Sequence, residues 1–176
     1  RKPGRWRTSG QSTGSMPFQT PWYTLAMSES SSSESSHRDH ETAADGVGSL
    51  GFAVVTLSDT RTEETDGSGR LIREAVTAAG HEVVRYAIVP DDPDAIRVEL
   101  GAAIDDAAVA VVVTSGGTGI SARDAAYETI SGMLEKRLDG FGELFRMLSY
   151  DEIGAAAMLS RAVGGIAGGT VVFSLP

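Results

Sequence analysis

The stretch AAVAVVVTSGGTGISARD, residues 107–124, decides the fold. Its first half is a run of small and β-branched residues, which is typical of a strand buried on both faces of a parallel sheet. Three glycines follow within four residues, and the stretch ends in the pair Arg123–Asp124. Glycines directly after a buried strand predict a strand-to-helix loop whose backbone amides are open to a ligand.

Strands and helices alternate on both sides of this stretch. The predicted strands cover 51–58, 82–90, 108–115 and 170–176. Apolar residues at helical spacing predict helices near 67–79, 93–107, 127–134, 141–149 and 151–163. Continuous apolar strands separated by helices predict a three-layer α/β/α fold with a mostly parallel sheet.

The loop after the third strand predicts an anion-binding cradle. Gly116, Gly117 and Gly119 carry no side chains, so backbone amides can approach a ligand closely. Ser115 and Thr118 add hydroxyl donors, and the N-terminus of the next helix adds its dipole. A phosphate is the best candidate ligand, although the loop matches neither a Walker A motif nor G-x-G-x-x-G. A tight turn without a ligand is an equally strong alternative.

Two further loops are expected at the same edge of the sheet, because ligands in such folds bind beyond the carboxyl ends of the strands. The first loop, LSDTRTEETDGSG at 57–69, carries Ser58, Asp59, Asp66 and Ser68. The second loop, VPDDPD at 89–94, carries Asp91, followed by Asp92 as the expected helix cap. A solvated loop with a helix cap is the alternative interpretation of the first loop.

Carboxylates beside an anion cradle create an electrostatic conflict. If Asp59, Asp91 and Asp124 all face the phosphate, like charges about 4 Å apart cost several kcal/mol. A Mg²⁺ ion would resolve the conflict, because it binds one or two carboxylates together with phosphate oxygens. The pattern therefore predicts a Mg²⁺-dependent phosphate-ester site, as in phosphoryl or nucleotidyl transfer.

The composition excludes several other classes of protein. The 176 residues contain no cysteine, which excludes disulfides and thiolate metal sites. A net charge of −9 argues against a nucleic-acid partner, and no apolar run is long enough to cross a membrane. Lysine occurs only at positions 2 and 136, and such an acidic, lysine-poor surface raises the hypothesis of a halophilic protein. A melting temperature that does not rise in molar KCl would contradict it.

Residues 1–45 differ from the rest of the chain. The segment SESSSSESS at 28–36 is polar and of low complexity, and it cannot bury enough apolar surface to fold. We expect a disordered tail at 1–45 and a globular domain at 46–176. Met27 is an alternative start residue, in which case residues 1–26 would be a gene-calling artefact.

Several of these motifs together resemble one known family. TSGGTGISARD is followed by GFGELFRMLSYDEIGAAAMLSRAVGG at 140–165, and it is preceded by LSDTRTEETDGSG and VPDD. In this order and spacing they resemble the MoaB/Mog family of molybdenum cofactor biosynthesis proteins, and the second block is similar to its MoaB branch. The resemblance covers about residues 51–176.

The resemblance implies a three-layer molybdopterin-binding fold in a cytoplasmic protein that assembles as trimers or hexamers and works with other proteins of the pathway. It implies that the ligand is molybdopterin, a pterin with a dithiolene and a terminal phosphate. Active members use ATP and Mg²⁺ to transfer AMP to that phosphate and release pyrophosphate. Such a member would be a molybdopterin adenylyltransferase.

The resemblance also carries residue roles. Asp91 and Asp124 match the family's two key acids, which implies catalytic roles and places Asp124 at the Mg²⁺ ion. Residues 116–119 would bind the phosphate or the pterin. The other matches are Ser58, Asp59, Asp66 and Ser68 in the first active-site loop, and Glu128, an acid that often follows the Arg-Asp pair. An exposed helix residue is the competing interpretation of Glu128.

Two departures from the family pattern keep alternatives open. Ala126 stands where the family often has threonine, and the chain stops at Pro176, where the family continues with a further loop and helix. We therefore expect a C-terminally truncated domain. The competing functions are a non-catalytic molybdopterin carrier of the same pathway and a nucleotide-binding or regulatory domain that shares only the fold. Asp91 and Asp124 favour the enzyme over the carrier.

The GFGE block has a second, structural interpretation. Phe141, Leu144, Phe145, Met147 and Leu148 fall at helical spacing, which favours packing in the core or at a subunit interface over ligand binding. Arg146 and Arg161 are candidate partners for acids across such an interface.

Overall fold

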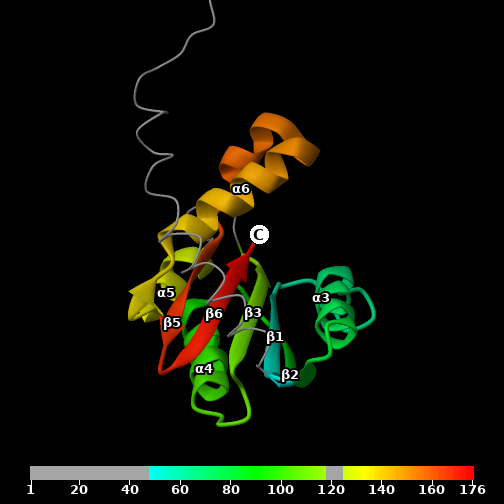
Figure 1. The fold of residues 1–176 in the computed structure, drawn as a ribbon, viewed down its shortest axis with the longest axis vertical. Coiled ribbons are helices and arrows are strands. Elements are labelled where there is room, and N and C mark those ends of the chain that lie inside the picture. Colours follow the sequence, from blue (N-terminus) through cyan, green and yellow to red (C-terminus); the bar gives the residue numbers. More distant parts are fainter. Residues whose placement is uncertain (1–47, 118–124) are drawn as a thin grey trace, which may run out of the picture. The chain divides into compact units, whose positions relative to one another are not determined.

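Six strands form one sheet in the order β2-β1-β3-β6-β5-β4 in a computed structural model, which describes residues 48–117 and 125–176 (Figure 1). The strands are β1 (Gly51–Leu57), β2 (Glu82–Val89), β3 (Val111–Gly116), β4 (Lys136–Arg137), β5 (Val163–Ala167) and β6 (Thr170–Leu175). Strands β2, β1, β3 and β6 are parallel, whereas β5 runs antiparallel to β6 and β4 antiparallel to β5. The prediction of a mostly parallel sheet is confirmed.

Within residues 48–117 and 125–176, four α-helices and one 3₁₀ helix lie between these strands. They are α3 (Gly67–Ala78), α4 (Pro93–Ile104), α5 (Ala126–Met133), α6 (Asp139–Ile153) and η1 (Gly154–Leu159). The carboxylate of Asp66 accepts a hydrogen bond from the backbone of Gly69 at the start of α3. Asp92 caps α4 in the same way, and Pro93 occupies its first position, where a missing N–H costs nothing. Asp92 is the cap that the sequence predicted, and Asp66 is one of the two candidates, Asp66 and Ser68, that it offered for α3.

The helices cover the two faces of the sheet, because neighbouring residues of a strand point to opposite faces. On one face, Val55, Val112 and Val172 belong to the main core with residues of α4 and α5. On the other face, α3 contacts β1 and β2, and the ring of Phe141 in α6 lies 4.8 Å from the ring of Phe173 in β6. The three-layer arrangement is confirmed.

The helix predicted at 151–163 is wrong. Helix α6 runs without interruption to Ile153 and ends at Gly154, whose φ of 60° cannot continue a right-handed helix. After η1 the chain extends into β5, which contains two consecutive glycines. A side chain at Gly165 would collide with the carbonyl oxygen of Lys136, so glycine is what lets β4 lie against β5. These glycines remove the alternating apolar pattern by which a strand is recognised.

Helix α6 and η1 carry an exposed apolar surface. The side chains of Leu144, Met147 and Leu148 are 58%, 59% and 65% exposed, although their spacing is that of a packed helix face. Ile153, Met158 and Leu159 are also exposed. We call these six residues the α6–η1 apolar face. Of the two interpretations made from the sequence, packing within the chain's own core does not hold for this face.

The predicted tail at 1–45, with the proposed artefact at 1–26, lies outside the described residues. A domain that begins near residue 46 therefore stays a prediction. In the described part of the chain, every helix is too short or too polar to cross a membrane.

Candidate functional site

The carboxyl ends of three neighbouring strands bring the predicted loops together. Leu57 at the end of β1 pairs with Val89 of β2 on one side and with Gly116 of β3 on the other, so the three strands end level. The backbone N–H of Ser58 donates a hydrogen bond to the carbonyl oxygen of Val89 (2.8 Å), which joins the first two loops at their starts. Sheet topology therefore creates the site edge that the sequence predicted.

The glycine loop starts in a conformation that only glycine adopts readily. Gly116 and Gly117 have φ angles of 99° and 63°, in the left-handed region. A Cβ atom at Gly116 would collide with the carbonyl oxygen of Leu57, and one at Gly117 would lie 3.2 Å from Oδ2 of Asp91. The carboxylate of Asp91 thus lies on the side of Gly117 that a Cβ atom would occupy. Thr118, Gly119 and Asp124, predicted for the same loop, lie outside the described residues.

Asp59 and Asp91 meet across the first two loops. The backbone N–H of Asp91 donates a hydrogen bond to Oδ1 of Asp59 (3.3 Å). Asp59 is exposed at the rim, whereas Asp91 is half-buried and its Oδ1 atom is buried. Two carboxylates repel an anionic ligand. Such a ligand would therefore need a cation or hydrogen-bond donors between it and these two acids.

Ser58 organises the first loop (residues 58–66) from within. Its Oγ accepts hydrogen bonds from the backbone N–H groups of Thr60 (3.3 Å) and Arg61 (3.1 Å). Thr62 and Thr65 close a second turn in the loop through a backbone-to-hydroxyl hydrogen bond of 2.9 Å. Ser68 is exposed in the first turn of α3. The loop is therefore held by hydrogen bonds of its own, although residues 59–65 are exposed. Because Asp66 also caps α3, the alternative of a solvated loop with a helix cap stays open.

Asp66 lies beneath this loop with only 3% of its surface exposed. Its carboxylate accepts hydrogen bonds from the hydroxyls of Thr56 (2.6 Å) and Tyr86 (2.7 Å) and from the N–H of Gly69 (2.9 Å). Burial alone would raise the pKa of Asp66, but these hydrogen bonds and the charge of Arg73 outweigh burial and lower its pKa. Burial and the hydrogen bond to Asp66 raise the pKa of Tyr86 to about 12.

Ser115 and Glu128 have different surroundings from these rim residues. Ser115 is 4% exposed, and its Oγ has no hydrogen-bond partner within residues 48–117 and 125–176. Glu128 is exposed in the first turn of α5 and forms an ion pair with Arg161, the second residue before β5. The guanidinium of Arg161 also lies 4.9 Å from the ring centre of Tyr127. Arg161, expected to pair across a subunit contact, thus pairs within the chain.

Sequence reasoning missed Thr56 and Tyr86, and it assigned Arg161 to a subunit contact rather than to Glu128. Each is recognised only through a partner that is distant in sequence, such as Asp66 for Tyr86 and Glu128 for Arg161. The one local signal is Thr56, a polar residue inside the apolar strand β1. Its side chain points to the face opposite to that of Val55, and the sequence alone does not say what it meets there.

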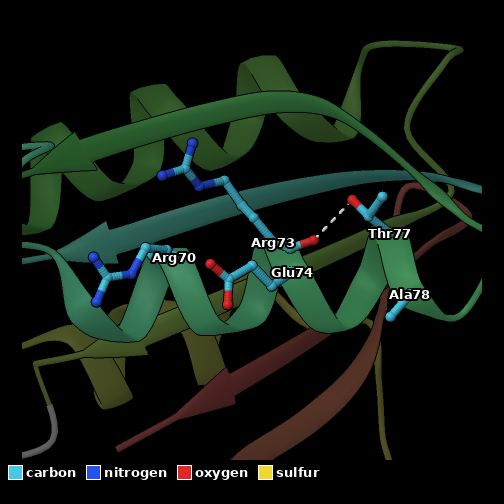
Figure 2. Close-up of a pocket in the computed structure, with 5 residues that line it drawn as sticks. All are labelled: Arg70, Arg73, Glu74, Thr77 and Ala78. Carbon is cyan, nitrogen blue, oxygen red and sulfur yellow. Dashed lines mark hydrogen bonds between the residues drawn. The ribbon is translucent and has the colours of Figure 1, made fainter.

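A pocket of about 550 Å³ opens on α3, lined by Arg70, Arg73, Glu74, Thr77 and Ala78 (Figure 2). Figure 2 shows that Arg70 and Arg73 extend from the helix in different directions, with Glu74 between them. Arg73 also lies 3.8 Å from Glu63. The charges around the pocket therefore largely cancel, which gives an anion little attraction. None of the predicted site residues lines it.

Metal ligands do not cluster in the described part of the chain. Within residues 48–117 and 125–176, no three His, Asp or Glu side chains lie close enough together to hold a metal ion. Asp59 and Asp91 offer two carboxylates, and the predicted metal ligand Asp124 lies outside these ranges.

Comparison with known proteins identifies the family. A family model described as "Probable molybdopterin binding domain" matches residues 53–176. The chain belongs to this family. Molybdenum cofactor biosynthesis protein B of Bacillus cereus is 54% identical to it over 124 residues, which cover 70% of this chain and 73% of that protein.

Solved structures of this family agree. A crystal structure of Molybdenum cofactor biosynthesis protein B is 53% identical, with a TM-score of 0.71, and the match covers 73% of this chain and 80% of that one. The tungsten cofactor synthesizing protein MoaB from Pyrococcus furiosus is 44% identical, with a TM-score of 0.65, and the match covers 73% and 82% of the two chains. The MoaB/Mog resemblance predicted from the motifs, and the fold that it implies, are confirmed.

Proposed function

We propose that this protein binds molybdopterin at the carboxyl edge of its sheet and takes part in molybdenum cofactor biosynthesis. The observation that carries the proposal is the position of the Asp91 carboxylate, which faces the Cβ position of Gly117 beside Asp59, in a member of this family. The glycine backbone offers amides to the terminal phosphate of molybdopterin, and the acids flank it.

The reaction that suits this arrangement is the transfer of AMP from ATP. An oxygen of the terminal phosphate of molybdopterin attacks the α-phosphorus of ATP, and the bond from that phosphorus to the bridging oxygen of pyrophosphate breaks. Adenylyl-molybdopterin and pyrophosphate are the products. The protein's task is to orient two phosphates that repel one another, which the amides of the glycine loop and the fixed rim of the sheet support.

Mg²⁺ fits the residues of this rim. Its preferred protein ligands are carboxylate oxygens, and it is commonly bound by one or two carboxylates together with substrate phosphates. Asp124 would hold it, and Asp91 would support that site. When bound, the ion would neutralise charge on the reacting phosphates. We therefore include ATP as co-substrate and Mg²⁺ as cofactor in the proposal.

A molybdopterin carrier without catalytic activity is the second candidate. Ala126 favours it, because a hydroxyl common in the family is missing where α5 begins, beside the glycine loop. For both the enzyme and the carrier, we include in the proposal a cytoplasmic location and association with other proteins of the same pathway.

The protein also forms homo-oligomers in this proposal, as trimers or hexamers. The α6–η1 apolar face supports it, because large exposed apolar patches mark protein–protein interfaces. In such an assembly, a second copy of the chain would cover the α6–η1 apolar face.

The decisive experiment uses two neighbouring acids. Asp91→Asn removes the charge that faces Gly117, whereas Asp92→Asn removes one charge but keeps the cap of α4, because asparagine caps helices as well as aspartate. Molybdopterin, ATP and Mg²⁺ are added to each variant, and pyrophosphate and adenylyl-molybdopterin are followed over time. We expect Asp91→Asn to lower turnover by about 10²-fold or more, and Asp92→Asn to stay within about twofold of wild type.

Other outcomes separate the candidates. Tight binding of molybdopterin without turnover, in wild type and in both variants, would replace the enzyme by the carrier. Binding of ATP without any binding of molybdopterin would contradict both.

A further inference from the structure

The carboxylate of Asp66 joins three elements of the fold at a single buried point. Oδ2 accepts hydrogen bonds from Thr56 of β1 and Tyr86 of β2, while Oδ1 accepts one from Gly69 of α3. Three donors on a carboxylate that is 3% exposed leave little room for a ligand to reach it. The side chain is thus engaged with the protein itself.

These contacts pin the two ends of the first loop. Thr56 lies two residues before the first loop, and Asp66 is its last residue. Their 2.6 Å hydrogen bond therefore holds the two ends of the loop together. Within this loop, Oγ of Ser58 accepts hydrogen bonds from two backbone N–H groups. The guanidinium of Arg61 donates a hydrogen bond to the carbonyl oxygen of Thr65 (3.0 Å). A loop that is closed at its two ends and hydrogen-bonded inside opens less readily than an unbonded one.

Asp59 follows Ser58 in this loop, and its carboxylate accepts a hydrogen bond from the backbone N–H of Asp91. Asp91 in turn faces Gly117. Tyr86 is itself held in place, because the guanidinium of Arg73 lies 4.0 Å from its ring centre. A continuous path of contacts therefore runs from Asp66 through the first loop to Asp91.

We propose that Asp66 is a positioning residue, which holds the ends of the first loop together so that Asp59 meets the backbone of Asp91. In this role Asp66 does not contact molybdopterin. The inference deepens the proposed function and rests on it only for the effect on the ligand.

Two glycines of α3 provide a matched test. A methyl group at Gly69 would overlap Oδ2 of Asp66, whereas a Cβ atom at Gly67 has nothing within 4 Å. Both residues lie in the first turn of the same helix, where alanine is favoured over glycine. Gly69→Ala therefore displaces the carboxylate, and Gly67→Ala is its control.

The first readout needs no ligand. Hydrogen exchange of the Asp91 amide is compared with that of the Val112 amide, which lies in the buried strand β3 and reports global opening. In Gly69→Ala we expect the Asp91 amide to exchange about tenfold faster relative to Val112, as for the loss of one hydrogen bond to a carboxylate. Gly67→Ala keeps the wild-type ratio. Equal acceleration of both amides, or no change in the ratio, overturns the proposal.

Tyr86→Phe provides a second test that keeps the aromatic ring under Arg73 and removes only one donor to Asp66. Its control is Glu99→Gln, which weakens the 2.7 Å contact of Arg85 with Glu99 on the opposite face of the same strand. We expect Tyr86→Phe to raise the Kd for molybdopterin about fivefold and to increase the relative exchange of the Asp91 amide.

The control fixes how these results are interpreted. Glu99→Gln should leave both quantities unchanged, and an equal rise in Kd in both variants would mean a general loss of stability and would overturn the proposal. If wild type fails to bind molybdopterin, the proposed function fails, while the exchange ratio still decides the role of Asp66.

Discussion

The backbone N–H of Asp91 points at the carboxylate of Asp59, with 3.3 Å between nitrogen and oxygen. The two residues are far apart in sequence and come from loops that follow adjacent parallel strands. This hydrogen bond fixes the distance between the first and second loops at the rim. The side chain of Asp59 therefore contributes to the site even if it never touches a ligand.

Replacing Asp59 by alanine should lower activity more than stability. The variant loses the acceptor for the Asp91 N–H, so we expect kcat/KM for AMP transfer to fall about tenfold. Because Asp59 is exposed, the free energy of unfolding in urea should change by less than about 1 kcal/mol. Glu64→Gln, at an exposed position of the same loop, is the control and should leave both quantities unchanged.

Two glycine substitutions should change stability in opposite directions. Gly117→Ala places a methyl group against Asp91 and Ala126 in a left-handed conformation, so we expect a loss of about 1–3 kcal/mol in the free energy of unfolding. Gly132 lies in α5 with nothing within 4 Å of its Cβ position, so Gly132→Ala should add about 0.5–1 kcal/mol. Urea unfolding measures both, and equal effects would show that φ at Gly117 does not constrain the residue.

Tyr86 should make the fold sensitive to alkaline pH. Its pKa rises from the ordinary value of 10.0 to about 12, so the neutral hydroxyl is favoured in the folded protein. This stabilisation is complete below pH 10 and is lost as the pH rises towards 12. The free energy of unfolding should fall less steeply over this range in Tyr86→Phe than in wild type. The exposed Tyr150 provides the control: Tyr150→Phe should keep the wild-type slope, and a slope as shallow as that of Tyr86→Phe would contradict the prediction.

Asp66 should act at the opposite end of the pH scale. Its folded pKa lies below the ordinary value of 3.8, so its ionised form stabilises the fold above that pH. The contribution is lost as the pH falls through the folded pKa. In Asp66→Asn, the acid side of the stability profile should be shallower than in wild type. An unchanged profile would mean that the three hydrogen bonds do not favour the carboxylate over the neutral acid.

The α6–η1 apolar face should be needed for assembly. Leu148→Glu introduces a charge at a side chain that is 65% exposed, so the folded monomer should tolerate it while an apolar interface should not. We expect sedimentation or light scattering to report a smaller assembly than wild type. Leu71→Glu, at a side chain 67% exposed on α3, is the matched control. Monomeric wild type would contradict the proposed homo-oligomer.

Local pattern predicted most elements of the fold because each has a signal in consecutive residues. The apolar runs of β1, β3 and β6 and the caps Asp66 and Asp92 are of this kind. Strand β5 has no such signal, because Gly164 and Gly165 serve close packing rather than side-chain alternation. Helical spacing identified α6 but could not tell a core face from an exposed one, since both need the same apolar stripe.

The site was predictable only as far as topology determines it. Parallel strands end at one edge, and this alone brings the loops of Asp59, Asp91 and Gly117 together. The partners of Asp66 depend on the register between β1 and β2, which places Tyr86 within reach. No motif in the sequence encodes that register, so the hydrogen bonds of Asp66 with Thr56 and Tyr86 could not be predicted.

Strand β5 runs antiparallel to β6, which brings a further segment of the chain to the edge where the parallel strands end. Val163, where β5 begins, pairs with Ser174 near the end of β6, so this strand starts where the parallel strands finish. The residues just before β5, including Arg161, therefore lie near this edge, and they belong to neither a strand nor a helix. Substitutions in this segment would therefore change the side chains near this edge without altering the pairing of the four parallel strands.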